Sequence, residues 1–364
     1  MNVNNFQLAD LYTDYLIASS SYTTATGLSS TMNHSISHDK ITRLLNQSEI
    51  FNSKAVWQMA KPIVREFETH DGCIAIDDCI EEKRFTDENE LICWHWDHTK
   101  GRNVKGVNFV SAFYNHRGAG IPLAVEFVKK SIIIKDSNTG KSKRKSERTK
   151  NEIYRELLYT VKQNQVKYQY VLNDTWFACA DNMKFVKNEL KKDFIMAIKE
   201  NRKVALSMKD KIQGKYVGIK TLELEQDSVV KIYLKQIDFP LLLVKKIFKN
   251  KDNSIGILYL VTSALDLTYE QITIFYHKRW RIEEYHKSVK HNVSFSKSPT
   301  KTVKSQLSHF YASILAYIKM ELLSFRTKLN HFAIKSKIYL GALQTAMCRL
   351  NELSTIHLKN QMTI

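Results

Sequence analysis

The chain is poor in residues that break regular structure. Only four of its 364 residues are proline and 11 are glycine, which leaves little sequence for flexible linkers or a loop-dominated scaffold. Its apolar runs, such as 256–265 and 310–318, are well short of the roughly 20 residues that a membrane-spanning helix needs. The first ten residues contain neither a basic nor an apolar signal region. We therefore expect long regular elements, no membrane partner and a cytoplasmic location.

Cysteine is also scarce, and its positions are scattered. The five cysteines lack a Cys-x-x-Cys pair and form an odd set that does not suit a disulfide framework. They are Cys73, Cys79, Cys93, Cys179 and Cys348. We expect reduced thiols.

Positive charge, in contrast, is abundant. The 55 Lys and Arg residues exceed the 37 Asp and Glu residues, for a formal net charge of +18. This sign favours a polyanionic partner, because cationic side chains on phosphates release condensed counterions. Charge alone does not separate nucleic acid from an anionic membrane surface. No basic amphipathic helix dominates the chain, however, so nucleic acid is the favoured partner.

The first 70 residues have a helical pattern. Apolar side chains recur at three- and four-residue spacing over 39–45 and 53–67, as in amphipathic helices. Ser37 is a suitable N-cap for the first of these helices. Two short helices here fit a helix-turn-helix reader of DNA, or a helical extension that only packs. We predict a helical DNA-binding region over 1–70.

The middle of the chain alternates between strands and helices. Apolar runs rich in β-branched residues predict buried strands, and their order around the helical segments predicts an α/β fold. The expected strands are 73–80, 107–114, 121–127, 168–172 and 193–198. The basic segment 141–150 reads as a mobile loop, and 202–262 alternates in a β manner that predicts a strand-rich insertion.

A helix is predicted from Thr268 to His291, opened by a capping box of Thr268 and Gln271. It contains Tyr276, Arg279, Glu283 and Lys290, whose spacing places all four on one face of an α-helix. Taken alone, this pattern is more typical of an ordinary Arg279/Glu283 ion pair on a solvated surface.

Two aspartates favour a chemical role for this helix. Asp78 ends one predicted buried strand and Asp174 ends another, and a carboxylate there is costly to bury without a cationic partner. Together with Glu283 they would supply three hard oxygen ligands for Mg²⁺ or Mn²⁺. A pair of such ions can support in-line displacement at phosphorus.

The same segments resemble a known family. The string Tyr276-x-x-Arg279-x-x-x-Glu283, followed seven residues later by Lys290, resembles the tyrosine-arginine-glutamate-lysine signature of bacterial insertion-sequence DDE transposases of the cut-and-paste type. The segments 76–79 and 171–177 resemble the first-aspartate strand and the second-aspartate segment of that family. The resemblance extends over about residues 35 to 350.

The resemblance implies an architecture. It is an RNase H-like catalytic core, interrupted by a β-rich insertion and flanked by helical N- and C-terminal regions. On this sequence the core falls on 71–200 and 263–325, the insertion on 201–262 and the C-terminal helical region on 326–364.

The resemblance also implies roles for residues. Asp78, Asp174 and Glu283 would be the catalytic triad that holds two Mg²⁺ or Mn²⁺ ions, while Tyr276, Arg279 and Lys290 would contact the DNA backbone. Arg281 and Lys287 are further candidate DNA contacts in the same segment. Asp77 is an open alternative to Asp78, since adjacent strand residues point to opposite faces and only one can enter the cluster; we favour Asp78. Cys79 stands where the family usually has threonine.

The implied activity is that of a transposase. Such a protein binds the terminal inverted repeats of its element, cleaves them in a metal-dependent reaction and transfers the freed strands to target DNA. Its partners would be double-stranded DNA, as transposon ends and target, and a second copy of the chain in the synaptic complex, with a nucleoid-associated location. One alternative is an RNase H-like nuclease without strand transfer, and another is a catalytically inert DNA-binding derivative.

Two further features leave alternatives open. The segment 93–98 contains one Cys, two His and two Trp, which fits a zinc site, an aromatic and basic surface beside DNA, or tryptophans packed in the core. Tyr259 lies where relatives place an aromatic residue that stacks on an extruded base.

Overall fold

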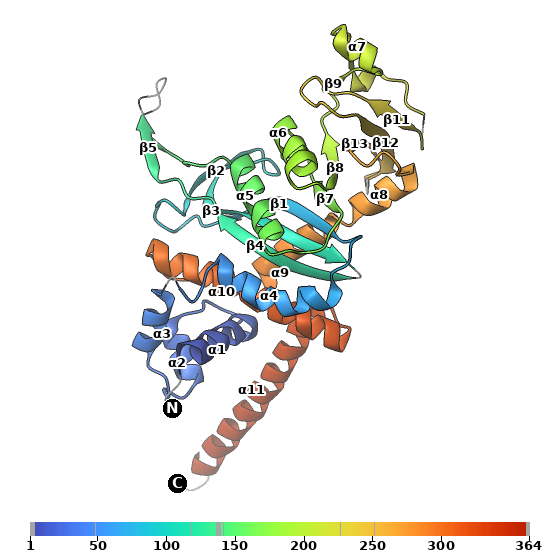
Figure 1. Cartoon of the computed structure of the whole chain (residues 1–364). Coiled ribbons are helices and arrows are strands. Elements are labelled where there is room, and N and C mark those ends of the chain that lie inside the picture. Colours follow the sequence, from blue (N-terminus) through green and yellow to red (C-terminus); the bar gives the residue numbers. More distant parts are fainter. Residues whose placement is uncertain are drawn as a thin grey trace. The chain divides into compact units, whose positions relative to one another are not determined.

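The computed structural model of the chain (Figure 1) describes residues 4–47, 49–116, 118–135, 140, 142–225, 227–250 and 252–361. The chain forms two compact units. We call Ser53–His286 the sheet unit, and Met1–Asn52 together with Lys287–Ile364 the helical unit. Within the described ranges, no helix has the length and apolar character needed to cross a bilayer.

The sheet unit contains every strand of the described chain and the helices between them. Its strands are β1 (Cys73–Glu82), β2 (Cys93–Asp97), β3 (Arg102–His116), β4 (Ala119–Phe127), β5 (Ile132–Lys135), β6 (Ser142–Lys145), β7 (Tyr170–Asn173), β8 (Asp193–Ile198), β9 (Lys203–Val204), β10 (Val217–Gly218), β11 (Val229–Ile232), β12 (Leu241–Lys249) and β13 (Ile255–Thr262). Its helices are α4 (Ser53–Phe67), α5 (Lys150–Gln163), α6 (Ala180–Lys184), the π-helical turn η1 (Phe185–Glu189), α7 (Met208–Ile212), the short 3₁₀ turn η2 (Ile219–Thr221), α8 (Tyr269–His277) and the first part of α9 (Trp280–Asn292).

Nine strands form one mixed sheet. Its order is β11-β12-β13-β8-β7-β1-β3-β2, and β4 also pairs with β3. β7 runs parallel to both β1 and β8, whereas the other neighbours in the sheet are antiparallel. The parallel strands β1 and β7 are joined through α5, as parallel pairs require a long crossover connection. The predicted α/β class is therefore confirmed.

Two segments differ from the sequence-based expectation. The region 202–262 is rich in strands as predicted, but β13 pairs with β8 and so joins β11, β12 and β13 to the central sheet. The basic segment 141–150 was predicted as a loop, yet it includes β6, which pairs with β5 in a separate hairpin. Alternating backbone hydrogen bonds can hold a strand of lysine and arginine when both its faces are exposed to water.

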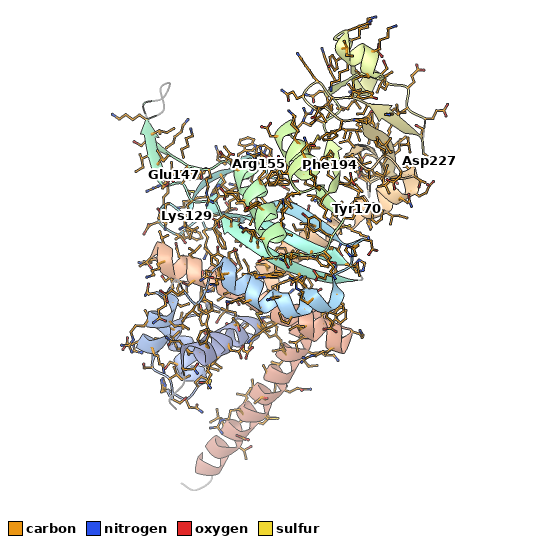
Figure 2. All side chains as sticks on the ribbon, in the orientation of Figure 1. Lys129, Glu147, Arg155, Tyr170, Phe194 and Asp227 are labelled. Carbon is orange, nitrogen blue, oxygen red and sulfur yellow. The ribbon has the colours of Figure 1, made fainter. Side chains whose placement is uncertain are left out.

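The two faces of the sheet are covered by different helices. On one face, the ring of Tyr285 in α9 stacks on Phe113 of β3 with centroids 5.0 Å apart, and its hydroxyl lies 3.3 Å from Ser111 Oγ. On the other face, the hydroxyl of Tyr154 in α5 donates to Asn173 Oδ1 at 3.0 Å. Figure 2 shows the side chains of the chain, among them Phe194 on β8. The sheet thus has an α9 face and an α5 face.

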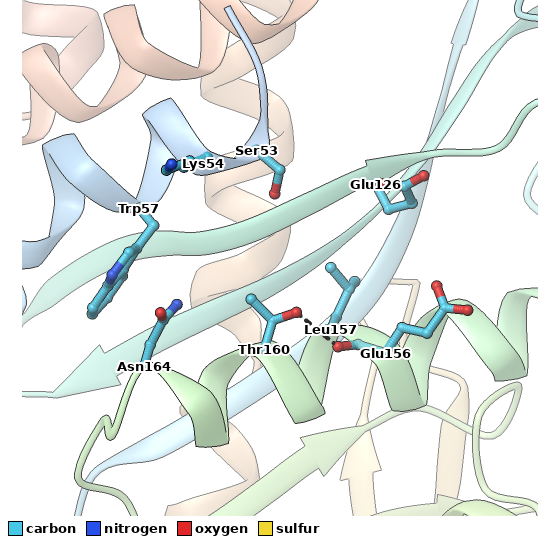
Figure 3. A pocket seen from close by; sticks show the side chains of 8 residues that line it. All are labelled: Ser53, Lys54, Trp57, Glu126, Glu156, Leu157, Thr160 and Asn164. Carbon is cyan, nitrogen blue, oxygen red and sulfur yellow. Dashed lines mark hydrogen bonds between the residues drawn. The ribbon is translucent and has the colours of Figure 1, made fainter. Parts of the chain in front are cut away.

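A pocket of about 320 Å³ lies between helices α4 and α5 (Figure 3). Its lining is formed by Ser53, Lys54, Trp57, Glu126, Glu156, Leu157, Thr160 and Asn164. The backbone N–H of Val125 in β4 donates to Ser53 Oγ at 3.4 Å, which fixes the start of α4 on the edge of the sheet. As far as the described residues go, this lining includes none of the candidate catalytic side chains.

The helical unit joins the two ends of the chain. Its helices are α1 (Asn5–Ala18), α2 (Ala25–Thr31), α3 (His38–Leu45), α10 (Val303–Thr327) and α11 (His331–Gln361). Tyr12 of α1 is fully buried, and its hydroxyl lies 2.9 Å from His309 Nδ1 in α10. The N-cap prediction for Ser37 is confirmed, because its side chain accepts from Lys40 N at 3.3 Å.

The two helices predicted in the N-terminal region are both present, as α3 and α4. They fall in different units, because α4 packs on β4 in the sheet unit while α3 packs on α10 in the helical unit. The predicted DNA-binding region over 1–70 therefore includes residues of both compact units.

The segment predicted as one helix from Thr268 to His291 is in fact two. α8 begins after the N-cap Thr268, with the expected capping box to Gln271, and ends at His277. α9 begins at Trp280. Between them, the backbone N–H of Arg279 donates to Tyr276 O at 3.0 Å, and that of Ile282 donates to Arg279 O at 3.0 Å. These i to i+3 bonds tighten the chain and place Arg279 in the turn between the helices.

Candidate active site

The two adjacent aspartates of β1 point to opposite faces of the sheet. Asp77 pairs with Ser111 of β3, and Ser111 contacts Tyr285, so Asp77 lies on the α9 face. Asp78 lies on the α5 face, where its Oδ2 accepts from Lys150 Nζ at 2.6 Å. The sequence favoured Asp78 for the carboxylate cluster. The geometry favours Asp77, because strand alternation turns Asp78 away from the helix that carries the glutamate.

Asp174 follows directly after β7. In the parallel pair of β1 and β7, Ile76 is in register with Asn173. The next residues, Asp77 and Asp174, are therefore neighbours across the two strands. The backbone N–H of Trp176 donates to Asp174 Oδ1 at 2.9 Å and holds the carboxylate in place.

Glu283 lies in the first turn of α9, and Arg279 connects it to β1. Arg279 Nη1 is 3.1 Å from Glu283 Oε1 and 3.4 Å from Asp77 Oδ2. The arginine side chain is only 14% exposed, and its guanidinium lies 5.7 Å from the centroid of the Tyr276 ring. The cation of Arg279 thus brings Glu283 beside Asp77, which lies 202 positions before Arg279 in the chain.

The clustered carboxylates and their burial shift the pKa values of Asp77 and Asp174. Burial raises the pKa of Asp77 well above its usual range, and the neighbouring charges of Asp174, Glu283 and Asp78 raise it further, while Arg279 lowers it. Burial also raises the pKa of Asp174, against the opposing effects of the Trp176 N–H and Arg279. Like charges gathered in a site of low polarity favour a cation, because each anion raises the cost of ionising the next.

The neighbours of Arg279 favour its charged form. Burial opposes its charge, but Tyr276, Asp77 and Glu283 raise the pKa of the guanidinium above its usual range. Burial raises the pKa of Tyr276 to about 12. Arg279 is therefore a permanent cation between the acids, and Tyr276 is a neutral phenol beside it.

A group of potential metal ligands exists at this place. Among the residues that the structure describes, the ligand atoms of Asp77, Glu283 and His286 lie within 4.8 Å of one another. Two carboxylates with a third from Asp174 beside them are the donor set that a divalent cation such as Mg²⁺ or Mn²⁺ takes. The residues present thus fit such an ion. The sequence-based reasoning missed His286, although its position three residues after Glu283 puts it on a neighbouring part of the same helix.

The chain matches two known protein families. Residues 4–218 match the family described as DDE superfamily endonuclease, and residues 141–319 match the family described as Transposase DDE domain. The first match covers more than half of the chain and includes Asp77 and Asp174, and the second includes Asp174 and Glu283. The chain belongs to the DDE superfamily of endonucleases. No curated protein matches it.

As a DDE enzyme, the chain belongs to a class that acts on DNA and generally uses divalent metal ions. The resemblance seen in the sequence is confirmed at this level. The acidic cluster around Asp77 and Glu283 is a suitable place for such ions in this DDE chain.

The remaining predicted DNA contacts of the DDE chain are spread along α9. Arg281 Nη1 pairs with Glu284 Oε2 at 2.5 Å, and its Nη2 donates to Gly118 O at 2.9 Å in the β3–β4 turn. The partners of Arg281 are therefore not among the clustered carboxylates of Asp77, Asp174 and Glu283. Lys287 is exposed and its ammonium lies 5.2 Å from the Phe332 ring centroid. Lys290 is half-buried on α9, seven residues after Glu283.

The segment 93–98 of the DDE chain alternates between core and surface. Cys93 and His95 are buried, with Sγ and Nε2 3.3 Å apart, and burial lowers the pKa of His95 to about 3, so its ring is neutral. Neither belongs to the cluster of three ligands found among the described residues. Trp94 and Trp96 are exposed, at 52% and 51%, so they do not pack in the core.

The suggestion for Tyr259 is not favoured by its position. Tyr259 lies in β13, where it pairs with Ile198 of β8, and is only 6% exposed. A ring buried within the sheet does not offer a free face to an extruded base.

Proposed function

We propose that this DDE enzyme is a transposase of the cut-and-paste type. It binds the terminal inverted repeats of an insertion sequence, cleaves at the element ends and transfers the freed strands to target DNA. The observation that carries this proposal is the meeting of Asp77, Arg279 and Glu283 beside Asp174, from three distant parts of a chain with a net charge of +18. A strongly basic protein with a carboxylate cluster is suited to phosphodiester chemistry.

The proposed core is RNase H-like. It consists of 71–200 and 263–325, with 201–262 inserted between the second aspartate and the glutamate. The parallel strands β1 and β7 lie side by side, with Asp77 in β1 and Asp174 directly after β7, which supports this assignment. The third acid, Glu283, follows on a helix, and this order of acids along the chain also supports it.

We assign the triad to Asp77, Asp174 and Glu283, with Asp77 in the place that the sequence favoured for Asp78. The three carboxylates would hold two Mg²⁺ or Mn²⁺ ions, and His286 is an additional donor that suits Mn²⁺ better than Mg²⁺. Such ions, when bound, activate the attacking hydroxyl or water and stabilise charge on the leaving oxygen of the phosphodiester.

The other residues act on the DNA and on the acids. Arg279 keeps the Glu283 and Asp77 carboxylates in position through its two contacts, and its remaining N–H groups can reach a phosphate oxygen. Lys290 and Lys287 would contact phosphates further along α9. The Tyr276 hydroxyl would donate a hydrogen bond to a DNA phosphate, because its pKa of about 12 keeps it protonated at neutral pH.

Synapsis of two element ends calls for two copies of the chain. We propose a homodimer with double-stranded DNA as the second partner, acting at the nucleoid. The exposed apolar side chains of α11 support self-association. They are Leu340, Leu343, Met347 and Leu350, each 56% to 63% exposed.

The test is an in vitro reaction that contains Mg²⁺, DNA with the flanking element ends and a target plasmid. Wild-type protein should nick the ends and join them to the plasmid, and Glu283→Gln should do neither while still binding the ends. A wild-type protein that binds the ends but yields neither product would contradict the proposal.

The description of the longer family match as an endonuclease keeps one alternative open. A nuclease without strand transfer would cut the ends in Mg²⁺ but would join no labelled end to the plasmid. An inert derivative would bind the ends, and Asp174→Ala or Glu283→Ala would then change nothing in a cell-based excision assay.

A further inference from the structure

Three exposed rings form a continuous surface in the sheet unit, which we call the aromatic ledge: Trp96, His98 and Trp176. The ring centroids of Trp96 and His98 are 6.3 Å apart, and those of His98 and Trp176 are 4.9 Å apart. The ledge therefore runs from the end of β2 to the segment that follows β7.

The ledge is open to solvent although its residues are of the kind that folding usually buries. Trp96 is 51% exposed and Trp176 is 43% exposed. The strand β2 turns Cys93 and His95 inward, so alternation turns Trp96 outward. Large aromatic rings kept at the surface, next to one another, indicate a contact surface for a partner.

The ledge begins at the acidic residues of the candidate active site. The backbone N–H of Trp176 donates to Asp174 Oδ1. Lys150 Nζ lies 5.6 Å from the centroid of the Trp176 ring and 2.6 Å from Asp78 Oδ2. The same cation thus lies beside an aspartate of β1 and over one ring of the ledge.

We propose that the aromatic ledge binds unpaired nucleobases of the DNA strand next to the cleaved phosphate, with Lys150 on the backbone. In a duplex each base is covered by its neighbours, so a protein ring can stack only on a base that has left the stack. The combination of stacking rings with a cation is the arrangement by which proteins bind single strands without reading sequence. This proposal rests on the proposed function, since it concerns the DNA strand at the same site.

The experiment measures binding by the full chain in EDTA, so that cleavage plays no part. The probes are a fluorescein-labelled oligothymidylate of about 12 nucleotides, within the range of known single-strand sites, and a blunt duplex of the same length. We expect Trp176→Ala to weaken binding of the single strand about 5- to 100-fold, the effect of losing one stacked base. Binding of the duplex should change less than about twofold, because all its bases except those of the two end pairs are covered on both faces by their neighbours. Trp96→Ala should have the same direction of effect.

Two variants make the result specific. Trp176→Phe retains a ring and should keep most of the single-strand affinity. Tyr159→Ala removes an aromatic side chain on α5 that is 51% exposed, outside the ledge, and should affect neither probe. If Trp176→Ala has a lowered melting temperature, Trp96→Ala replaces it, since its ring lies on a strand surface.

The outcomes separate this proposal from the proposed function. Three results would each contradict the proposal that the aromatic ledge binds unpaired bases. They are equal losses of affinity for both probes, no loss in either tryptophan variant, and a wild-type protein that does not bind the single strand. A wild-type protein that binds the single strand through the ledge but cuts and joins nothing in Mg²⁺ would overturn the transposase proposal alone.

Discussion

Asp77 and Asp78 have the same side chain but lie on opposite faces of β1. Asp77 is 8% exposed and is placed with Arg279 and Glu283. Asp78 is bound by Lys150 and by Asn108, whose Nδ2 donates to it at 3.0 Å. Since both carboxylates have similar chemistry, their different partners decide which one can hold a metal ion in this cluster.

Replacing each aspartate separately tests this assignment. We expect Asp77→Asn to lower the rate of end cleavage in Mg²⁺ by about 10²- to 10³-fold, because several kcal/mol of charge stabilisation are lost. Asp78→Asn, its matched control, should lower the rate less than Asp77→Asn does, by about 100-fold at most. This is the loss expected for a residue that only supports the site. The rates come from single-turnover cleavage of a labelled end, and a larger loss for Asp78→Asn would reverse the assignment.

Replacing Arg279 should change the stability of the fold as well as the activity. Arg279→Met leaves the carboxylates of Asp77 and Glu283 without their shared cation, so in EDTA we expect the free energy of unfolding to fall by about 3 kcal/mol. Mg²⁺ should raise the melting temperature of this variant more than that of the wild type, because the ion replaces the lost charge. Equal shifts in both proteins would contradict the expectation that the ion and Arg279 neutralise the same carboxylates. A Lys278→Met variant serves as the control for losing a neighbouring cation.

At the scale of elements, the break between α8 and α9 places the key arginine. An uninterrupted helix would keep Tyr276, Arg279 and Glu283 on one stripe. The i to i+3 bonds around Arg279 instead put it in a turn, from which its side chain reaches Asp77 on β1. The strand β1 must also keep its register with β3, because that register sets which aspartate faces α9.

A substitution at Gly106 tests how closely the strands β1 and β3 must approach each other. It pairs with Glu82, and a Cβ at this position would lie 2.1 Å from the backbone oxygen of Glu81. We expect Gly106→Ala to destabilise the fold by about 1–3 kcal/mol, since the strands must move apart. Urea unfolding measures this loss. Gly341→Ala is the control, because nothing lies within 4 Å of its added Cβ in α11, and a helical alanine should stabilise by about 0.5–1 kcal/mol. Equal effects would contradict the close-approach explanation.

At the scale of the whole molecule, the long helix α11 presents an apolar stripe. The positions 340, 343, 347 and 350 have the three- and four-residue spacing of a coiled-coil seam. All are exposed in the single chain. This stripe is therefore the surface on which the proposed homodimer depends.

We expect Leu343→Glu to raise the dimer dissociation constant at least about tenfold, because a buried charge at the seam costs more than about 1.4 kcal/mol. Light scattering with end DNA present measures the assembly state. Asn351→Glu introduces the same charge beside the stripe and should leave the dimer intact. If Leu343→Glu assembles like the wild type, α11 is not the dimer surface.

The net charge of +18 should govern affinity for DNA. We expect the affinity for double-stranded ends to fall about 10³-fold or more between about 50 and 200 mM salt, as for proteins with six or more phosphate contacts. Lys290→Ala should reduce the slope by about one, if Lys290 binds one phosphate. Fluorescence anisotropy measures both, and an affinity independent of salt would contradict a binding mode based on phosphates.

By itself, the sequence determined the class of the fold and the kinds of residue in the candidate site. Strand and helix patterns predicted β1, β7, β8 and the capped start of α8, because these depend on local periodicity. Asp174 was predicted because a carboxylate at the end of a buried strand is costly to bury, and Arg279 and Glu283 because their spacing places them on one face of a helix. The family match agrees with the resemblance to DDE transposases.

Tertiary structure decided which side chains meet. The choice between Asp77 and Asp78 depends on which helix covers which face of the sheet, and one-residue alternation cannot show this without the packing. The addition of His286, the aromatic ledge and the joining of β11, β12 and β13 to the central sheet depend likewise on contacts between distant segments. Local sequence fixes periodicity, whereas the folded chain alone fixes which faces are in contact.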